Sequence, residues 1–87
     1  MAAVKARVLI RPKEGILDPQ GKAVEGALPA MGWTNVSDVR VGKHVELVVE
    51  SDSEEAARTQ VDDMAHRLLS NPVIEDVTIL TAAEAHR

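Results

Sequence analysis

The residue types that could bind a metal are dispersed along this chain of 87 residues. Its three histidines, His44, His66 and His86, fall in an expected turn, an expected helix and the C-terminal tail. No two of them share a helix at a spacing of three or four residues, whereas a zinc site needs several ligands brought to one point. This spacing argues against a metal site. The lack of cysteine excludes thiolate ligands, thiol nucleophiles and disulfides.

The residues that could act as acids, bases or nucleophiles form no catalytic pattern either. The adjacent carboxylates Glu54-Glu55, Asp62-Asp63 and Glu75-Asp76 could supply an acid and a base. Neighbours on a helix do not face each other, so we interpret these pairs as solvated charge. The four serines stand in capping or turn settings, and no nucleophile-elbow or glycine-rich phosphate motif occurs.

Two basic positions could contact an anion or a partner. Arg11 and Lys13 precede an expected helix, but Asp18 at its start would occupy the place of a phosphate and is better interpreted as a helix cap. Arg40 and Lys43 project from the end of an expected hairpin. Two interpretations of that pair remain open, namely contact with a partner and simple solubility of the turn.

The first half of the chain predicts a strand followed by a helix. Residues 4–11 alternate between apolar and polar side chains, as a half-buried strand does. Asp18-Pro19 is a helix-start signal after a loop over 12–17, and Gly32 is a suitable C-terminal residue. Pro29 predicts a kink or a tightened last turn. The expected buried stripe of this helix is Ala23, Val24, Ala27, Leu28 and Met31.

The middle of the chain predicts a hairpin of residues 36–41 and 45–50. A loop of Gly42, Lys43 and His44 would pair Val39 with Leu47 and keep one face apolar. The same register would place Arg40 opposite Glu46 on the outer face.

The second half predicts another helix and a last strand. Asp52 or Ser53 caps the helix, and Asn71-Pro72 ends it before a strand over 73–80. A single domain over 1–80 would then leave a frayed tail over 81–87. The order β-α-β-β-α-β predicts a ferredoxin-like α+β fold, with two helices on one face of a four-stranded antiparallel sheet. The expected buried stripe of the second helix is Ala57, Val61, Met64, Ala65 and Leu68.

Composition narrows the classes of partner. The net charge is −4 and Trp33 is the only aromatic residue, which argues against a nucleic-acid surface. No apolar run approaches the length of a membrane helix and no signal-peptide pattern opens the chain, so we expect a cytoplasmic protein. A domain this small gains from association. The mixed outer face of the sheet is either solvated or a contact between subunits.

Three stretches together resemble the PurS family, the small subunit of phosphoribosylformylglycinamidine (FGAM) synthase. They are Lys13–Ala23, Asp38–Lys43 and Leu68–Glu75, and the resemblance covers residues 3–80. It implies a ferredoxin-like subunit of an ATP-dependent ligase in purine biosynthesis, with no active site of its own. Such a subunit supports assembly and ammonia transfer between a glutaminase and a synthetase, and forms dimers or tetramers. ATP and Mg are used by the complex and not by this subunit alone.

On this resemblance we expect two elements to contact the partner subunits, the loop and helix start from Lys13 to Gly21 and the hairpin end from Arg40 to Lys43. Two alternatives stay open, namely a regulatory module of the same fold that binds a small ligand, and a small hydrolase of phosphates. The expected partner-binding residues are Lys13, Glu14, Gly15, Asp18, Pro19, Gln20, Gly21, Arg40, Gly42 and Lys43.

Overall fold

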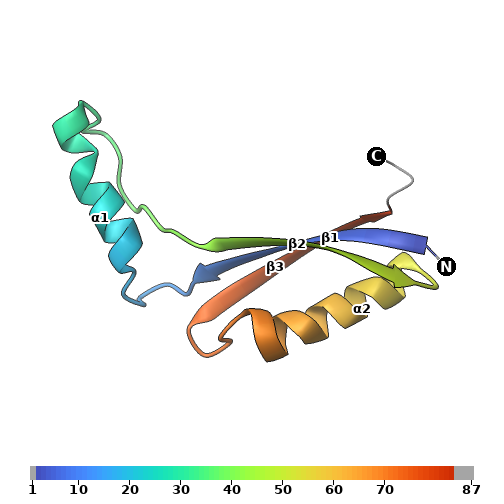
Figure 1. The fold of residues 1–87 in the computed structure, drawn as a ribbon. Coiled ribbons are helices and arrows are strands. Elements are labelled where there is room, and N and C mark those ends of the chain that lie inside the picture. Colours follow the sequence, from blue (N-terminus) through green and yellow to red (C-terminus); the bar gives the residue numbers. More distant parts are fainter. Residues whose placement is uncertain (1, 84–87) are drawn as a thin grey trace.

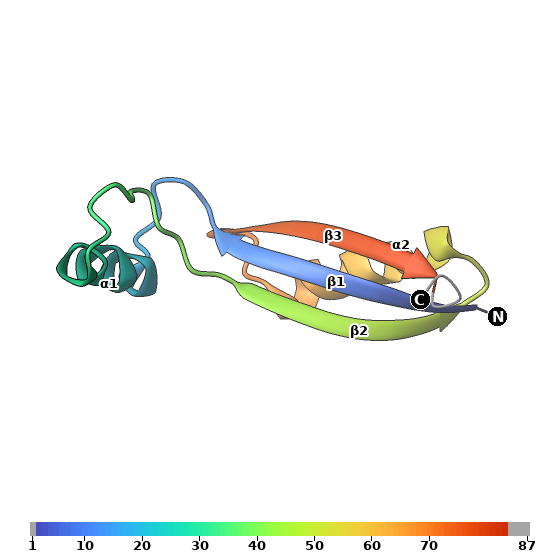
Figure 2. The ribbon, with the colours of Figure 1, turned by 90° about the horizontal axis from the view of Figure 1, so that it is seen from above.

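A computed structural model describes residues 2–83, which form a three-stranded antiparallel sheet and two helices (Figures 1 and 2). The strand order is β2-β1-β3, so the first strand lies in the centre. The α+β class predicted from the sequence is confirmed. The elements are β1 (Ala2–Pro12), α1 (Pro19–Ala27), the 3-10 turn η1 (Pro29–Met31), β2 (Lys43–Ser51), α2 (Glu54–Met64), the π turn η2 (Ala65–Leu69) and β3 (Glu75–Ala83).

The core lies between the sheet and α2, which follows one face of it (Figure 2). The alternation along β1 places one set of side chains inward, as the sequence pattern predicts, and all four are at most 1% exposed. Across the strands, Val8 aligns with Val45 of β2 and Ile79 of β3. The buried core residues are Val4, Ala6, Val8, Ile10, Val49, Ala57, Val61, Ala65 and Ile79.

The start of α2 follows the expected capping pattern. The Ser53 hydroxyl accepts a hydrogen bond from the amide of Ala56 at 3.0 Å, and two glutamates occupy the first turn. Their negative charge is favourable at the positive end of the helix dipole. This cap fixes where α2 begins, and so which of its faces meets the sheet.

The end of α2 departs from the expected register. Ala57, Val61 and Ala65 are buried as predicted, but Leu68 is 82% exposed and the prediction that it is buried is wrong. The reason is the π turn, in which the amide of Ser70 donates to the carbonyl of Ala65, five residues back. The wider turn adds one residue to the helix and shifts the position that faces the core by one residue. Leu69 therefore packs against the core in place of Leu68.

The predicted hairpin of residues 36–41 and 45–50 is wrong. Residues 36–42, called the strap below, are extended but join no strand, so the described sheet has three strands and not four. Asp38 has a φ of +64°, a left-handed conformation that interrupts an extended ladder. β2 pairs with β1 instead, which places Arg7 and not Arg40 opposite Glu46.

The prediction that both helices cover the sheet is also wrong for this chain. Figure 1 shows α1 standing beyond the end of the sheet, connected to it by the loop before α1 and by the strap. The radius of gyration is 16.5 Å, against about 12 Å for a compact domain of this length. Consequently, the rest of the chain does not cover the expected apolar stripe of α1. In this stripe, the side chain of Val24 is 43% exposed and that of Met31 is 67% exposed.

The ends of the elements follow local signals with one exception. α1 ends at Ala27 and continues into η1 at Pro29, with Gly32 at a φ of +105°, as the proline and glycine predict. β3 runs beyond residue 80, because Thr81 pairs with Ala6 and donates through its hydroxyl to Glu54 at 3.0 Å. Residues 84–87 of the expected frayed tail lie outside the described residues. No helix within residues 2–83 is long and apolar enough to cross a membrane.

Candidate partner-binding site

The three stretches that carry the family resemblance meet at the end of the sheet where β1 finishes. The amide of Lys13 donates to the carbonyl of Ile74 at 2.9 Å, which ties the loop before α1 to the turn before β3. The ammonium of Lys43 lies 3.4 Å from the carbonyl of Leu69, which brings the start of β2 beside the end of η2. Segments far apart in the sequence therefore form one continuous surface.

Asp18 connects α1 to the strap. One carboxylate oxygen, Oδ1, accepts from the amide of Gly21 at 3.1 Å, which is the helix cap predicted from the sequence. The other, Oδ2, accepts from the amide of Val41 at 2.8 Å. About two helical turns further along, the Glu25 carboxylate accepts from the amide of Val39 at 3.2 Å. The carboxylates of Asp18 and Glu25 thus accept from alternate amides of the strap. In a sheet, the carbonyl groups of a neighbouring strand would accept from alternate amides in the same way.

These contacts perturb the acidity of Asp18. The Val41 amide lowers the pKa of this carboxyl most, followed by the Gly21 amide, while desolvation opposes them and the nearby charge of Arg40 adds to the lowering. Hydrogen bonds to a carboxylate favour its ionised form. Asp18 is therefore an anion at neutral pH, and its charge holds the strap in place.

Acid should release this contact. Because the pKa of Asp18 is below its usual 3.8 in the folded chain, its contribution to stability is present above pH 3.8. That contribution is lost as the pH falls through the lower, folded value. We expect the amide of Val41 to lose protection in that window, measured by hydrogen exchange. An Asp18→Asn variant should show no such step, and equal pH profiles for the two proteins would contradict this assignment.

The predicted site residues line two adjoining cavities. The larger has a volume of about 420 Å³ and lies between the loop, α1 and the strap. The smaller, of about 250 Å³, lies between the start of α1, the start of β2 and the turn before β3. Lys13, Glu14, Gly15, Asp18 and Arg40 line the larger cavity, and Asp18, Pro19, Gln20, Gly42 and Lys43 line the smaller.

The remaining predicted residue, Gly21, is buried where α1 meets the strap. A Cβ there would meet the Asp18 carboxylate and would lie 2.6 Å from the carbonyl oxygen of Val39. Only glycine allows so close an approach. Gly21 therefore allows the strap to lie close to α1, and it presents no side chain to a partner.

Sequence reasoning missed several lining residues. Glu25 was not singled out from the sequence, although it lies about two helical turns after Asp18 on the side of α1 that holds the strap. Ile16 and Leu17 are apolar residues within a loop, a pattern that could have marked them as contacts. The lining residues not predicted are Ile16, Leu17, Lys22, Glu25, Asp38, Val39 and Val41, with Pro12, Ile74 and Glu75.

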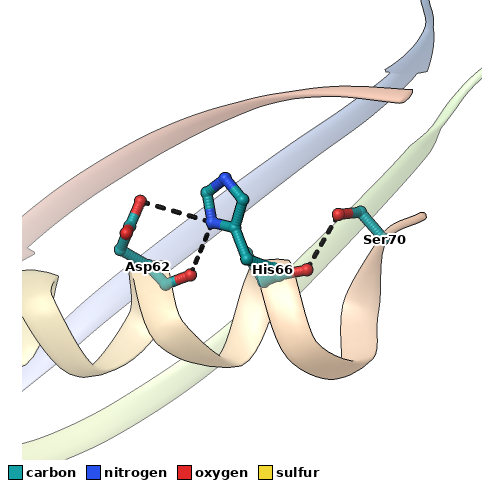
Figure 3. Close-up of polar contacts among 4 residues, drawn as sticks. Asp62, His66 and Ser70 are labelled. Atoms are coloured by element: carbon teal, nitrogen blue, oxygen red, sulfur yellow. Dashed lines mark hydrogen bonds and ion pairs between the residues drawn. The ribbon is translucent and has the colours of Figure 1, made fainter. Parts of the chain in front are cut away.

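The polar side chains of α2 form a second cluster, drawn in Figure 3. His66 Nδ1 lies 2.8 Å from the carbonyl of Asp62 and 3.6 Å from its carboxylate. The Ser70 hydroxyl donates to the carbonyl of Ala65 at 2.8 Å and not to the imidazole. These contacts satisfy backbone carbonyls at the π turn. Within residues 2–83 no group of three or more His, Cys, Asp or Glu is placed to hold a metal ion.

Comparison with known proteins identifies the family. A family model described as "PurS: Phosphoribosylformylglycinamidine (FGAM) synthase" matches residues 5–83. The chain is 46% identical over 72 residues to the phosphoribosylformylglycinamidine synthase subunit PurS of Bacillus subtilis, covering 83% of this chain and 84% of that protein. It is 39% identical over 75 residues to the Methanocaldococcus jannaschii subunit of the same name, covering 86% and 90%.

A solved structure extends the comparison to three dimensions. A chain of the structure described as PurLQS from Thermotoga maritima superposes with a TM-score of 0.86 at 28% identity. The match covers 94% of this chain and all of that one. Agreement of sequence and fold over nearly the whole chain leads to one conclusion: the chain belongs to the PurS family of FGAM synthase subunits.

Proposed function

We propose that this chain is the PurS subunit of FGAM synthase and acts in purine biosynthesis by assembling with other subunits. The observation that carries this proposal is its likeness, over 94% of its length, to a chain of the Thermotoga maritima PurLQS structure. A second solved relative, from Methanocaldococcus jannaschii, is described as a subunit of formylglycinamide ribonucleotide amidotransferase in the purine biosynthetic pathway. Its TM-score is 0.80 at 35% identity.

The role that we propose is assembly without catalysis. A glutaminase subunit releases ammonia from glutamine, and a synthetase subunit uses it with ATP and Mg to form the amidine, in the cytoplasm. Ammonia that escapes into water is protonated and lost to the reaction, so the two active sites must be held in close and sealed contact. A small subunit that binds both enzymes can provide that contact.

The motif-bearing end of the sheet is the surface that we assign to this binding. The backbone of the strap is held to α1 by Asp18 and Glu25, so the surface is formed before a partner binds. Such preorganisation lowers the entropy that association costs. Arg40, which is exposed, and Lys43 supply positive charge at its edge.

Self-association is a further part of the proposal. The apolar stripe of α1 lies outside the core of its own chain, although the sequence predicts that it is buried. A homodimer or a tetramer would cover this stripe and the mixed outer face of the sheet, where Val48 is 56% and Leu80 44% exposed. Stable interfaces bury about 1,200 Å² or more, so self-association would have to cover an extended part of the surface of this chain.

A charge-removal experiment tests the assignment of the binding surface. The double variant Arg40→Ala, Lys43→Ala should assemble with the other two subunits about tenfold more weakly at low salt, with a smaller difference at high salt. Affinity is measured by titration of labelled protein into the synthetase and glutaminase. The variant Arg58→Ala, Arg67→Ala removes equal charge from the exposed side of α2 and η2 and is the control. Unchanged affinity of the first variant would remove the strap end from the interface.

A further inference from the structure

The larger cavity of the candidate site is lined by charges of both signs that do not pair with each other. They come from the loop before α1, from α1 and from the strap, so the fold brings three segments together around one space. Within residues 2–83, no ion pair involves any of these five side chains. Each is therefore able to bind a charged group of a ligand. The five residues are Lys13, Glu14, Lys22, Asp38 and Arg40.

The two other carboxylates that line this cavity already have partners. Asp18 accepts from the amides of Gly21 and Val41. Glu25 accepts from the amide of Val39. The side chains left to a ligand are consequently three cations and two carboxylates. A ligand with two anionic groups and one cationic group complements this set of charges.

The cavity is formed before a ligand enters it. Its walls include α1 and the strap, which run side by side (Figure 1), and the carboxylates of Asp18 and Glu25 hold them together. Its volume of about 420 Å³ falls within the range of about 300–1,000 Å³ for small-molecule sites. Ile16, Leu17 and Val39 supply apolar surface for the carbon chain of a ligand.

We propose that this cavity binds a free dicarboxylic amino acid, namely glutamate. The two carboxylates of the ligand contact Lys13, Lys22 and Arg40. Its ammonium group contacts Glu14 and Asp38. A phosphate ester suits the cavity less well, because it has no cation for these two acids. The choice of glutamate among such amino acids rests on the proposed function, since a glutaminase that acts beside this subunit releases glutamate from glutamine.

Calorimetric titration of the isolated wild-type chain tests the site with three probes. Glutamate should bind at one site per chain. Glutamine lacks the side-chain carboxylate and glutarate lacks the ammonium group, so each should bind about tenfold more weakly than glutamate. Equal affinity for glutamate and glutarate would overturn the proposal, and so would the absence of glutamate binding.

Two substitutions separate the contacts to the carboxylates from the contact to the ammonium group. Lys22→Gln changes an exposed residue of α1, so it should keep the melting temperature of the wild type and weaken glutamate and glutarate alike. Asp38→Asn keeps the left-handed backbone, which asparagine tolerates, and should weaken glutamate about tenfold without weakening glutarate. Arg67→Gln removes a charge that does not line the cavity and is the control. Wild-type affinity for glutamate in both cavity variants would contradict the assignment.

A separate measurement of assembly distinguishes this inference from the proposed function. A chain that assembles with the synthetase and glutaminase but binds no glutamate overturns the inference and leaves the proposed function in place. A chain that binds glutamate with the expected specificity but binds neither subunit supports the cavity assignment and overturns the proposed function.

Discussion

Gly42→Ala is expected to lower the free energy of unfolding by about 1–3 kcal/mol, among the largest effects of any single methyl group in this chain. A Cβ at Gly42 would meet the carbonyl oxygen of Ile10 and would lie 3.1 Å from the Cα of Arg11. Both neighbours are backbone atoms of β1, which is held on two sides by hydrogen-bonded strands. Neither can move without disturbing the ladder, so the strain stays at the point where the strap enters β2.

The matched control for this substitution is Gly26→Ala in α1. A Cβ there meets nothing within 4 Å, and alanine favours a helix over glycine by about 1 kcal/mol. The two variants differ only in where the same methyl group is added. Urea denaturation should show Gly42→Ala destabilised and Gly26→Ala unchanged or more stable. Equal midpoints for both variants would show that the close approach of the strap to β1 is not present in solution.

Asp18→Ala is expected to free the strap from α1. The substitution removes the cap of α1 and the acceptor of the Val41 amide together, since one carboxylate serves both. Hydrogen exchange should accelerate several-fold at Gly21 and Val41, while amides in the centre of β1 stay protected. The affinity for the partner subunits should also fall in this variant. The strap would then become ordered only on association, and the entropy lost in ordering it would oppose binding.

Asp52→Ala provides the control, since it removes an exposed carboxylate that lines neither cavity and leaves both hydrogen bonds of Asp18 in place. It should exchange and assemble as the wild type does. If Asp18→Ala leaves the exchange of the Val41 amide unchanged, the carboxylate does not hold the strap. The proposal that the binding surface is formed before a partner binds would then be wrong.

Much of the fold is readable from local pattern. β1 and the start of α2 carry clear signals, namely an alternation of period two and a serine cap followed by glutamates. Their inward residues were predicted correctly, because packing on a single face imposes the period directly. β3 was also found, but its end was not, since pairing with β1 extends it beyond the last apolar residue.

The wrong predictions concern segments whose structure depends on contacts with distant parts of the chain. Residues 36–41 alternate well enough to predict a strand, yet β2 pairs with β1 and Asp38 turns the strap out of an extended ladder. The stripe of α1 was predicted to be buried, but nothing in its own sequence shows which surface covers it. Leu68 was misplaced because a period of 3.6 residues assumes a regular helix, and a π turn breaks that period without a local signal.

The candidate site was predicted in part. Asp18 was expected to cap α1, and it does. Its second hydrogen bond, to an amide 23 residues away, could not be foreseen from residue type or spacing. The loop and hairpin-end residues were chosen on the family resemblance, and the structure brings them around two adjoining cavities. The apolar residues beside them escaped notice because their exposure depends on the tertiary fold.

Turnover with two nitrogen donors tests the central claim most directly. The synthetase and glutaminase are assayed for amidine formation from formylglycinamide ribonucleotide, with glutamine or with added ammonia, in the presence and absence of this chain. An assembly subunit predicts that glutamine-driven turnover depends on the chain, while turnover driven by ammonia persists without it. Full glutamine-driven turnover by the two larger subunits alone would contradict the account.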